Sequence, residues 1–542
     1  MPTRMNSTLF FNGNILTQDP SQPTAESVLV ENDKIKLVGR QADLLPAISS
    51  STQLFDLNSS TLLPGFHDAH IHVWKVGHLL TYMLDLRGVG SIRELQEKLA
   101  AFAQKTDSQW VLGRGFNEAN LAEQRLPTRS DIDEAVPDRP VWLIRTCAHV
   151  AVANSKALEL AGITEQTQAP FGGAIGKDER GRLTGIFSET ALGLVANHIP
   201  PPTENEYRQM ILAACQKLRS LGVTAATDPA VMPDLLAVYQ KMALENALPI
   251  RLDALAIRLP DGGKEALPLP EKFYHPFFRC DGVKFFADGG MSGATAALRR
   301  TYRGGKNKGI LRLDPAQFFA LANEAFENGF RIGTHAIGDA ALDLVIDIYQ
   351  KLASFSDVPN VGRVLNPADV FTNLRIEHVG LPTRKHLKIM AKHGIMGIFQ
   401  PIFLAELGLN FRRYLPLSYL NKVYPIRQTL DAGVQIALST DAPVVGELRP
   451  FLNIKAAMLR QDANGEPINP AESISMEEAL FAYTMGSAGA SGEAENRGSI
   501  TPGKWADLVV WSGNPLKMKV EELERLKPEA VFVAGEKVFG ER

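Results

Sequence analysis

The amino-acid sequence predicts an α/β protein whose centre is a (β/α)8 TIM-like barrel. Apolar, strand-like runs alternate with longer helical stretches through the middle of the 542-residue chain, as parallel βα units do. Short alternating runs with tight turns occur at both ends, and they predict a small β-sandwich built from both termini. Roughly 150 residues separate the first two barrel strands, far more than a usual loop, and they predict a large insertion after the first strand.

Composition narrows the classes of partner. Lys and Arg number 57, Asp and Glu number 60, and the formal net charge is −3. This balance provides no basic footprint for nucleic acid or for an anionic membrane, so we expect neither partner. No run approaches the roughly 20 apolar residues of a membrane span, and residues 1–8 lack the apolar core of a signal peptide. Three widely spaced cysteines form no disulfide or metal pattern, and we expect a cytoplasmic protein.

Both ends of the chain read as small antiparallel sheets. Residues 8–61 contain short apolar runs, and Asn32-Asp33 between two of them is a hairpin signal. Residues 498–511 and 530–539 show similar runs with Gly and Pro between them. We assign residues 1–61 and 496–542 to the two parts of one sandwich; two separate small sheets are the alternative.

Eight strand-like segments account for the barrel. They are Leu62–His72, Gly222–Asp228, Ile250–Ile257, Gly282–Asp288, Phe330–His335, Leu374–His378, Ile395–Gln400 and Val434–Asp441. We assign residues 62–74 to the first strand and 201–495 to the remainder of the barrel. A doubly wound open sheet is the alternative, but the first strand is not followed by Gly-x-Gly-x-x-Gly.

Residues 75–200 form the predicted insertion. This segment has helical patterns of its own and strand-like runs at 110–113 and 141–145. Because it leaves from the C-terminal end of the first strand, we expect it to cover the mouth of the barrel as a substrate lid.

Potential metal ligands occur where several predicted strands end. His70 and His72 are one residue apart, so in a strand both imidazoles face the same side. The fourth, fifth, sixth and eighth strands carry Lys284, His335, His378 and Asp441. In such barrels the catalytic groups lie at the C-terminal ends of strands. Imidazole and carboxylate ligands suit zinc and similar divalent ions.

Together with their flanking motifs, these residues resemble the amidohydrolase superfamily. The flanking sequence motifs are similar to those of the amidohydrolase-3 branch, which includes N-substituted formamide deformylase-like proteins. The matching motifs are Pro64–His72, Leu126–Asp133, Pro137–Val141, Asn154–Leu158, Gly282–Gly289 and Gly498–Leu508. The resemblance covers about residues 8–540, the insertion included.

The resemblance implies one or two divalent metal ions, zinc first among them. In the two-metal pattern His70 and His72 bind the first ion with Asp441, and His335 and His378 bind the second. Lys284 would bridge both ions after N-carboxylation by carbon dioxide. The alternatives without a metal are an ordinary ion pair of Lys284 with Asp288 or Asp441, and a turn-capping role for Asp441.

Five further residues are candidates for substrate binding. His149, Asn154 and Glu189 lie in the insertion, Asp288 shares the strand face of Lys284, and Gln400 ends the seventh strand. Internal hydrogen bonding is the alternative role for those in the insertion.

The predicted reaction is hydrolysis of an amide-type, non-peptide carbon–nitrogen bond of a small molecule. A divalent ion lowers the pKa of bound water to about 7, and Asp441 is the candidate that takes the proton and passes it to the leaving nitrogen. A heterocycle deaminase or cyclic-amide hydrolase would use the same ligands, and a non-catalytic regulatory protein retaining the fold is a third alternative. The sequence leaves a homo-oligomer open.

Overall fold

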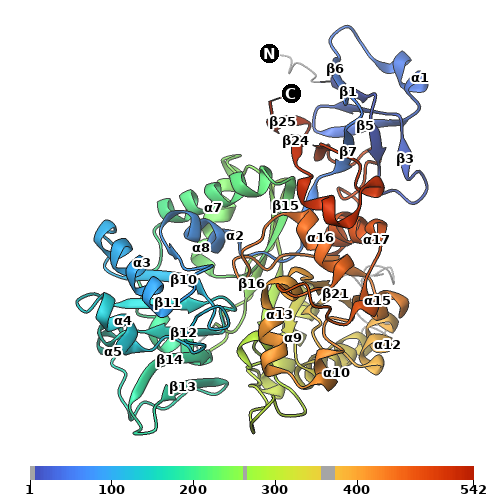
Figure 1. Cartoon of the computed structure of the whole chain (residues 1–542). Helices are drawn as coiled ribbons and strands as arrows, with labels where there is room; N and C mark the ends of the chain where they lie inside the picture. The colour runs from blue at the N-terminus through green and yellow to red at the C-terminus, as the bar shows by residue number, and fades with distance from the viewer. Residues whose placement is uncertain (1–6, 261–264, 356–372, 542) are drawn as a thin grey trace.

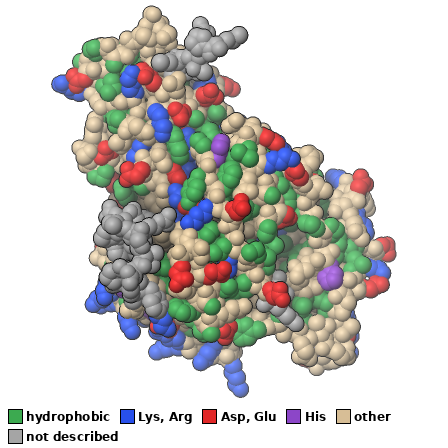
Figure 2. All heavy atoms as spheres, turned by 180° about the vertical axis from the view of Figure 1, so that it is seen from behind, with side chains coloured by type: hydrophobic (Ala, Val, Ile, Leu, Met, Phe, Trp, Pro, Cys, Tyr) green, Lys and Arg blue, Asp and Glu red, His purple; other side chains and the backbone are tan. Residues whose placement is uncertain are grey.

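The computed structural model describes residues 7–260, 265–355 and 373–541, and Figure 1 shows three parts. A sandwich containing both chain ends stands at the top, the barrel lies below it, and the insertion lies to the left. The predicted fold class is confirmed. None of the described helices is long and apolar enough to cross a membrane. Acidic and basic side chains are interspersed over the face that Figure 2 shows.

The sandwich has two sheets. The first contains β1 (Ser7–Phe11), β4 (Ser27–Glu31), β5 (Lys34–Gly39) and β6 (Gln53–Asp56), with the short helix α1 (Gln41–Leu44) beside it. The second joins strands of both chain ends: β2 (Asn14–Leu16), β3 (Thr24–Ala25), β7 (Thr61–Pro64), β23 (Leu508–Trp511), β24 (Pro528–Val533) and β25 (Glu536–Phe539). One core lies between the sheets, where Phe10 of the first packs edge-on against Phe532 of the second at 4.9 Å. Strands of both chain ends share this core, and a smaller cluster of Leu9, Leu29 and Leu44 lies within the N-terminal part.

The barrel sheet is parallel along its eight main strands. In spatial order these are β8 (Phe66–Asp68), β15 (Val223–Val231), β16 (Arg251–Ile257), β18 (Phe278–Phe286), β19 (Arg331–Ala336), β20 (Leu374–His378), β21 (Met396–Phe399) and β22 (Ile436–Leu438). A ninth strand, β17 (Phe273–His275), pairs antiparallel with β18. Backbone hydrogen bonds from Ala69 N–H to the Leu438 carbonyl (3.3 Å) and from Asp441 N–H to the His70 carbonyl (2.7 Å) join the first strand end to the eighth.

Helices surround the barrel, but the repeat is not regular. The helices are α7 (Glu204–Arg219), α8 (Pro233–Leu244), α9 (Pro315–Glu327), α10 (Asp339–Phe355), α12 (Arg384–Lys392), α13 (Ile402–Tyr414), α14 (Leu417–Leu420), α15 (Ile426–Asp431), α16 (Pro450–Leu459), α17 (Met476–Phe481) and α18 (Ser487–Ala490). Between β16 and β18 the described residues contain β17 and no helix. The described residues of this connection therefore lack the helix that a complete set of eight βα repeats would place there.

The predicted first strand, Leu62–His72, is wrong as a single element. It divides at Gly65 into β7, which belongs to the sandwich, and β8, which begins the barrel. Gly65 lies so close to Thr224 that a Cβ atom would stand 2.0 Å from the Thr224 hydroxyl oxygen. Because only glycine fits there, the chain can pass from one sheet directly into the other.

The insertion has its own six-stranded sheet with an apolar cluster on each face. Its strands are β9 (Leu84–Asp85), β10 (Val111–Phe116), β11 (Val141–Arg145), β12 (Val150–Ala153), β13 (Gly173–Lys177) and β14 (Leu183–Glu189). Its helices are α3 (Ile92–Lys105), α4 (Arg129–Ala135), α5 (Ser155–Leu160) and α6 (Gly193–Ala196), whereas α2 (Val73–Thr81) packs on α7 of the barrel. The insertion reaches the barrel mouth: the Thr146 hydroxyl donates to the Val444 carbonyl (2.6 Å), three residues after Asp441.

Candidate metal centre

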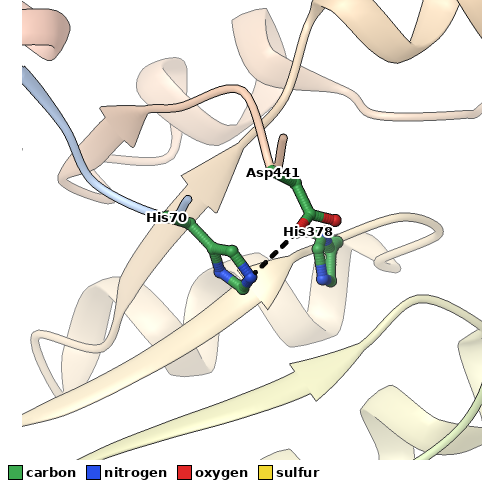
Figure 3. Close-up of side chains that lie close together, drawn as sticks. All are labelled: His70, His378 and Asp441. Atoms are coloured by element: carbon green, nitrogen blue, oxygen red, sulfur yellow. Dashed lines mark ion pairs between the residues drawn. The ribbon is translucent and has the colours of Figure 1, made fainter. Parts of the chain in front are cut away.

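Three buried side chains converge at the C-terminal end of the barrel. Figure 3 shows His70, which follows β8, His378 at the end of β20 and Asp441 after β22 pointing toward one another. One ligand atom of each lies within 4.8 Å of the other two. The three residues are at most 6% exposed. Two imidazoles and a carboxylate at this spacing are a donor set for a divalent ion.

The backbone at this site adopts conformations that are uncommon for residues other than glycine. The φ angles of His378 and Asp441 are 75° and 58°. His70 and His72 also leave regular structure, because β8 ends at Asp68. The prediction that both histidines lie within a strand is wrong, yet both Nε2 atoms approach Asp441 Oδ1, at 3.3 and 3.4 Å. Strained backbone of this kind gathers at functional sites.

Neighbouring polar groups fix the orientation of two imidazoles. His70 Nδ1 lies 2.6 Å from Glu377 Oε2, and His378 Nδ1 lies 2.7 Å from Gln400 Oε1. Each carboxyl or amide oxygen accepts an N–H from Nδ1 and leaves Nε2 with its lone pair. Partners of this type orient metal-binding histidines and raise their basicity.

His72 and His335 lie at the border of this group. His72 Nε2 contacts Asp441, while the His335 ring stands 4.5 Å from the His378 ring, centroid to centroid. His335 Nε2 is 3.2 Å from the Gly289 carbonyl, so Nδ1 is the nitrogen left for another ligand. The tightest group, His70–His378–Asp441, therefore takes members from both of the predicted metal sites, and the division into two sites stays a prediction.

Lys284 is buried beside these side chains. It is 0% exposed, and its Nζ atom lies 4.8 Å from the centroid of the Phe286 ring. No described residue lies within hydrogen-bond distance of Nζ, so the predicted alternative of a close ion pair with Asp288 or Asp441 is absent. Burial lowers the pKa of Lys284 to about 8, partly offset by the carboxylate of Glu377.

Burial keeps most of the imidazoles neutral. It lowers the pKa of His72 and of His378 to about 3 and holds that of His335 well below its usual value. Burial also lowers the pKa of His70, but the carboxylates of Asp441 and Glu377 outweigh it and raise the pKa overall. Neutral imidazole is the form that binds metal ions.

Two predicted substrate residues, His149 and Glu189, form a pair at the edge of the site. His149 Nδ1 lies 2.9 Å from Glu189 Oε2, and the His149 ring is 5.1 Å from that of His335. Burial raises the pKa of Glu189, but His149, Arg312 and Thr295 together outweigh it, so the pKa is lowered overall. The insertion thus contributes side chains to the barrel mouth.

The other predicted substrate residues have structural partners. The Asn154 side chain caps α5 and forms hydrogen bonds with the backbone of Val136, Arg139 and Val141. It lies outside the pocket. Asp288 accepts backbone N–H groups of Ala297, Ile337 and Gly338 at 2.7–3.0 Å. Gln400 orients His378 and donates to the Ser439 hydroxyl at 2.8 Å. In this geometry all three hold protein groups rather than facing a ligand.

A small pocket opens beside the candidate ligands. The volume open to a water-sized probe is about 20 Å³. Its polar lining includes His149, His335, His378 and Asp441. Most of its other lining residues are apolar or aromatic: Met291, Ile337, Phe403, Leu407, Phe411, Tyr424 and Val444. A space of this size has room for about one water molecule beside the candidate ligands.

Comparison with known proteins places this site in a family. The model of the amidohydrolase family matches residues 53–539, which is most of the chain. The chain belongs to the amidohydrolase family. It is 28% identical to N-substituted formamide deformylase of Arthrobacter pascens, over 98% of both chains. Crystal structures of uncharacterized metal-dependent hydrolases resemble it: that from Pyrococcus horikoshii OT3 at 25% identity and TM-score 0.74, over 95% of this chain and 99% of the other, and that from Pyrococcus furiosus at 27% and 0.71, over 94% and 100%.

Membership makes this protein an amidohydrolase, a metal-dependent enzyme acting on carbon–nitrogen bonds other than peptide bonds. The residues present fit a divalent ion. His70 and His378 are each held through Nδ1, leaving Nε2 for a ligand, and Asp441 Oδ1 is buried without a hydrogen-bond partner among the described residues. The assignment of each ligand remains a prediction.

Glu377 has a role at this amidohydrolase's metal centre that was not predicted from the sequence. Arg375 and Glu377 are two residues apart in β20, so both side chains point into the barrel. Arg375 Nε donates to Glu377 Oε1 at 2.7 Å, while the other carboxylate oxygen faces His70. The available signal was a charged pair at i and i+2 in this short strand, next to His378.

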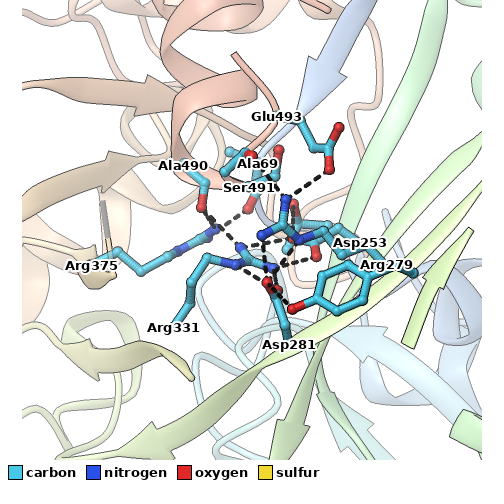
Figure 4. Close-up of polar contacts among 12 residues, drawn as sticks. Ala69, Asp253, Arg279, Asp281, Arg331, Arg375, Ala490, Ser491 and Glu493 are labelled. Carbon is cyan, nitrogen blue, oxygen red and sulfur yellow. Dashed lines mark hydrogen bonds and ion pairs between the residues drawn. The ribbon is translucent and has the colours of Figure 1, made fainter. Parts of the chain in front are cut away.

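Glu377 is anchored to a larger buried network. Figure 4 shows Arg375 and Arg331 approaching the Ala490 carbonyl, and Arg331 paired with Asp253 and Asp281. Arg375 also donates to the Ala69 carbonyl at 2.6 Å, next to His70. The segment around Ala490, which precedes the C-terminal part of the sandwich, therefore helps to hold Arg375 and, through it, Glu377 beside His70.

Proposed function

We propose that this amidohydrolase hydrolyses an amide-type, non-peptide carbon–nitrogen bond of a small molecule, with zinc as its divalent ion. The observation that carries the proposal is the buried group of His70, His378 and Asp441 at the C-terminal end of the barrel, beside a small pocket. The relative named N-substituted formamide deformylase supports an amide substrate. His72 and His335 complete the proposed ligand set.

Asp441 would act as the proton carrier. A divalent ion bound at this site would lower the pKa of a water molecule and so supply hydroxide near neutrality. The pKa of Asp441 is well below its usual value, because His70 and His72 outweigh burial, which raises it. The carboxylate is therefore ionised, the form that can accept a proton, and we assign it the transfer of the proton from water to the leaving nitrogen. The products would be a carboxylic acid and an amine.

Lys284 is the proposed site of N-carboxylation. Its pKa of about 8 leaves part of the amine neutral near physiological pH. A neutral Nζ attacks carbon dioxide, forms an N–C bond and releases a proton, which turns a buried cation without a hydrogen-bond partner into an anionic oxygen ligand. Intact mass measured under native conditions would show the added carbon dioxide, and Lys284→Met would lack it.

His149 and Glu189 are the proposed substrate contacts from the insertion. Glu189 holds the His149 ring by its Nδ1 atom, which leaves Nε2 for a hydrogen bond with a ligand in the pocket.

A substrate panel tests the proposed reaction. Zinc-loaded protein is incubated with N-formyl and N-acyl amines, cyclic amides and aminated heterocycles, and acid, amine and ammonia are measured. We expect acid and amine from an N-substituted amide, and no turnover by Asp441→Asn with its fold intact. Ammonia release from a heterocycle alone would replace amide hydrolysis by deamination, and turnover of no substrate would favour a regulatory protein.

A further inference from the structure

Asp228 lies beside His72, next to the ring nitrogen that does not face Asp441. It belongs to β15, the neighbour of β8 in the barrel, and Ile71 N–H donates to the Thr227 carbonyl at 3.0 Å. This bond holds the segment that carries His72 alongside the strand that carries Asp228. Asp228 is 1% exposed and His72 is 7% exposed, so both side chains are shielded from solvent.

The Asp228 carboxylate is held through one of its two oxygens. Oδ2 accepts a hydrogen bond from the Tyr239 hydroxyl at 2.6 Å. Tyr239 is a fully buried residue of α8, and its ring stacks on Phe278 with 5.4 Å between centroids. Because Tyr239 occupies Oδ2, Oδ1 is the oxygen left for another partner.

Asp228 Oδ1 and His72 Nδ1 are two buried polar atoms without a partner. They lie 3.9 Å apart, and neither has a hydrogen-bond partner among the described residues. A hydrogen bond between nitrogen and oxygen spans about 2.7–3.2 Å, so a shift of about 1 Å in either side chain closes the gap. Buried polar groups are normally paired, and leaving them unpaired is unfavourable. A bond between these two atoms satisfies both.

Other imidazoles at the metal centre already have a partner of this kind. His70 and His378 each direct Nδ1 to a carboxyl or amide oxygen, at 2.6 and 2.7 Å, which leaves Nε2 facing the centre. His72 has the same orientation, with Nε2 3.4 Å from Asp441 Oδ1 and Nδ1 toward Asp228. What His72 lacks is the short contact between Nδ1 and its acceptor.

We propose that Asp228 is a positioning residue whose Oδ1 accepts a hydrogen bond from His72 Nδ1–H when a divalent ion is bound. With the proton on Nδ1, Nε2 keeps the lone pair that binds the ion, and the negative charge makes the imidazole more basic. The role rests on the proposed function, since it requires His72 as a ligand. Through Tyr239 it makes the outer helix α8 part of the support of the metal centre.

The affinity for zinc tests this role. For Asp228→Ala we expect zinc affinity to fall by about 10–100-fold in a competitive titration, the usual effect of changing such a partner. Asp228→Asn should lose less, because its amide oxygen still accepts from His72. The matched control is Asp507→Asn, which changes a buried carboxylate that contacts Arg251 at the start of β16. The control should lower Tm without lowering zinc affinity.

The proton on His72 separates positioning from a merely structural role. In zinc-loaded protein labelled with nitrogen-15 histidine, NMR should show a His72 Nδ1–H signal that exchanges slowly with water and is absent in His72→Gln. In Asp228→Ala we expect this proton to exchange faster.

Zinc affinity equal to that of the wild type in both Asp228 variants would overturn the role, as would an unchanged Nδ1–H signal. If Asp228→Ala does not fold, Asp228→Asn alone decides by the same two measurements. A wild-type protein that binds no zinc, or His72→Gln that binds it as tightly as the wild type, would instead refute the proposed ligand set, and the role of Asp228 with it.

Discussion

At the residue scale, the metal centre depends on side chains that bind no metal themselves. Glu377 is fully buried between Arg375 and His70; burial raises its pKa, but Arg375, Lys284 and the hydrogen bond with His70 hold it well below the usual value. A carboxylate so placed keeps the proton of His70 on Nδ1 and leaves Nε2 for the metal. The orientation of His70 thus follows from an ion pair within strand β20.

Glu377→Gln should weaken metal binding. The amide oxygen still accepts from His70, but the negative charge that makes the imidazole more basic is lost. Changes of such partners typically lower metal affinity by about 10–100-fold. The measurement is a competitive zinc titration against a chromophoric chelator, with the surface variant Glu97→Gln as control. Equal zinc affinities for both variants would show that Glu377 only packs beneath His70.

At the element scale, loops rather than strands place the reacting groups. His70, His72 and Asp441 all lie beyond the ends of β8 and β22, and they are brought together by the backbone bonds that close the barrel. Periodicity in the sequence finds strands, because residues of one face repeat every second position. It does not find where a strand ends, and so the sequence predicted the neighbourhood of these residues but not their backbone.

The insertion shows the same limit. Its strands at 110–113 and 141–145 were predicted, since they are apolar runs of ordinary length. The hydrogen-bond partners of Asn154 were not predicted. They are backbone groups of Val136, Arg139 and Val141, and only the tertiary structure brings these groups to one side chain. A polar residue in a motif can serve the fold as well as the substrate.

Asn154→Ala should destabilise the insertion. Asn154 Oδ1 accepts from Ala157 N–H at 3.0 Å as the N-cap of α5, and the side chain bonds three further backbone groups. Loss of an N-cap typically costs about 0.5–2 kcal/mol. Differential scanning fluorimetry should show a lower Tm than for the exposed control Asn464→Ala, with KM unchanged. A raised KM at unaltered Tm would restore Asn154 as a substrate contact.

At the scale of the whole molecule, the sandwich is tied to the barrel by a buried ion pair. Arg251 of β16 contacts Asp507, which precedes β23, at 2.6 Å, and both side chains are at most 5% exposed. The Arg251 guanidinium also stacks 3.9 Å from the Trp505 ring centroid. The composite sandwich could be predicted from strand-like runs at both ends, but this pair could not, because nothing in the sequence relates positions 251 and 507.

Asp507→Ala should loosen the junction between sandwich and barrel. Removing one partner leaves the Arg251 charge buried and uncompensated, which costs about 3–5 kcal/mol. The exposed control Asp107→Ala should leave Tm unchanged, whereas Asp507→Ala should lower it by several degrees in a thermal melt. Identical melting curves would mean that Trp505 and neighbouring packing suffice to hold the junction.

Activity should require a divalent ion held by His70, His378 and Asp441. The most direct test measures amide hydrolysis by protein stripped with a chelator, before and after stoichiometric zinc is added, with bound metal determined by elemental analysis. We predict no turnover in the stripped protein and recovery in proportion to bound zinc, with neither binding nor recovery in a His70→Ala, Asp441→Ala double variant. Full turnover without bound metal, or equal zinc binding by the double variant, would contradict the claim.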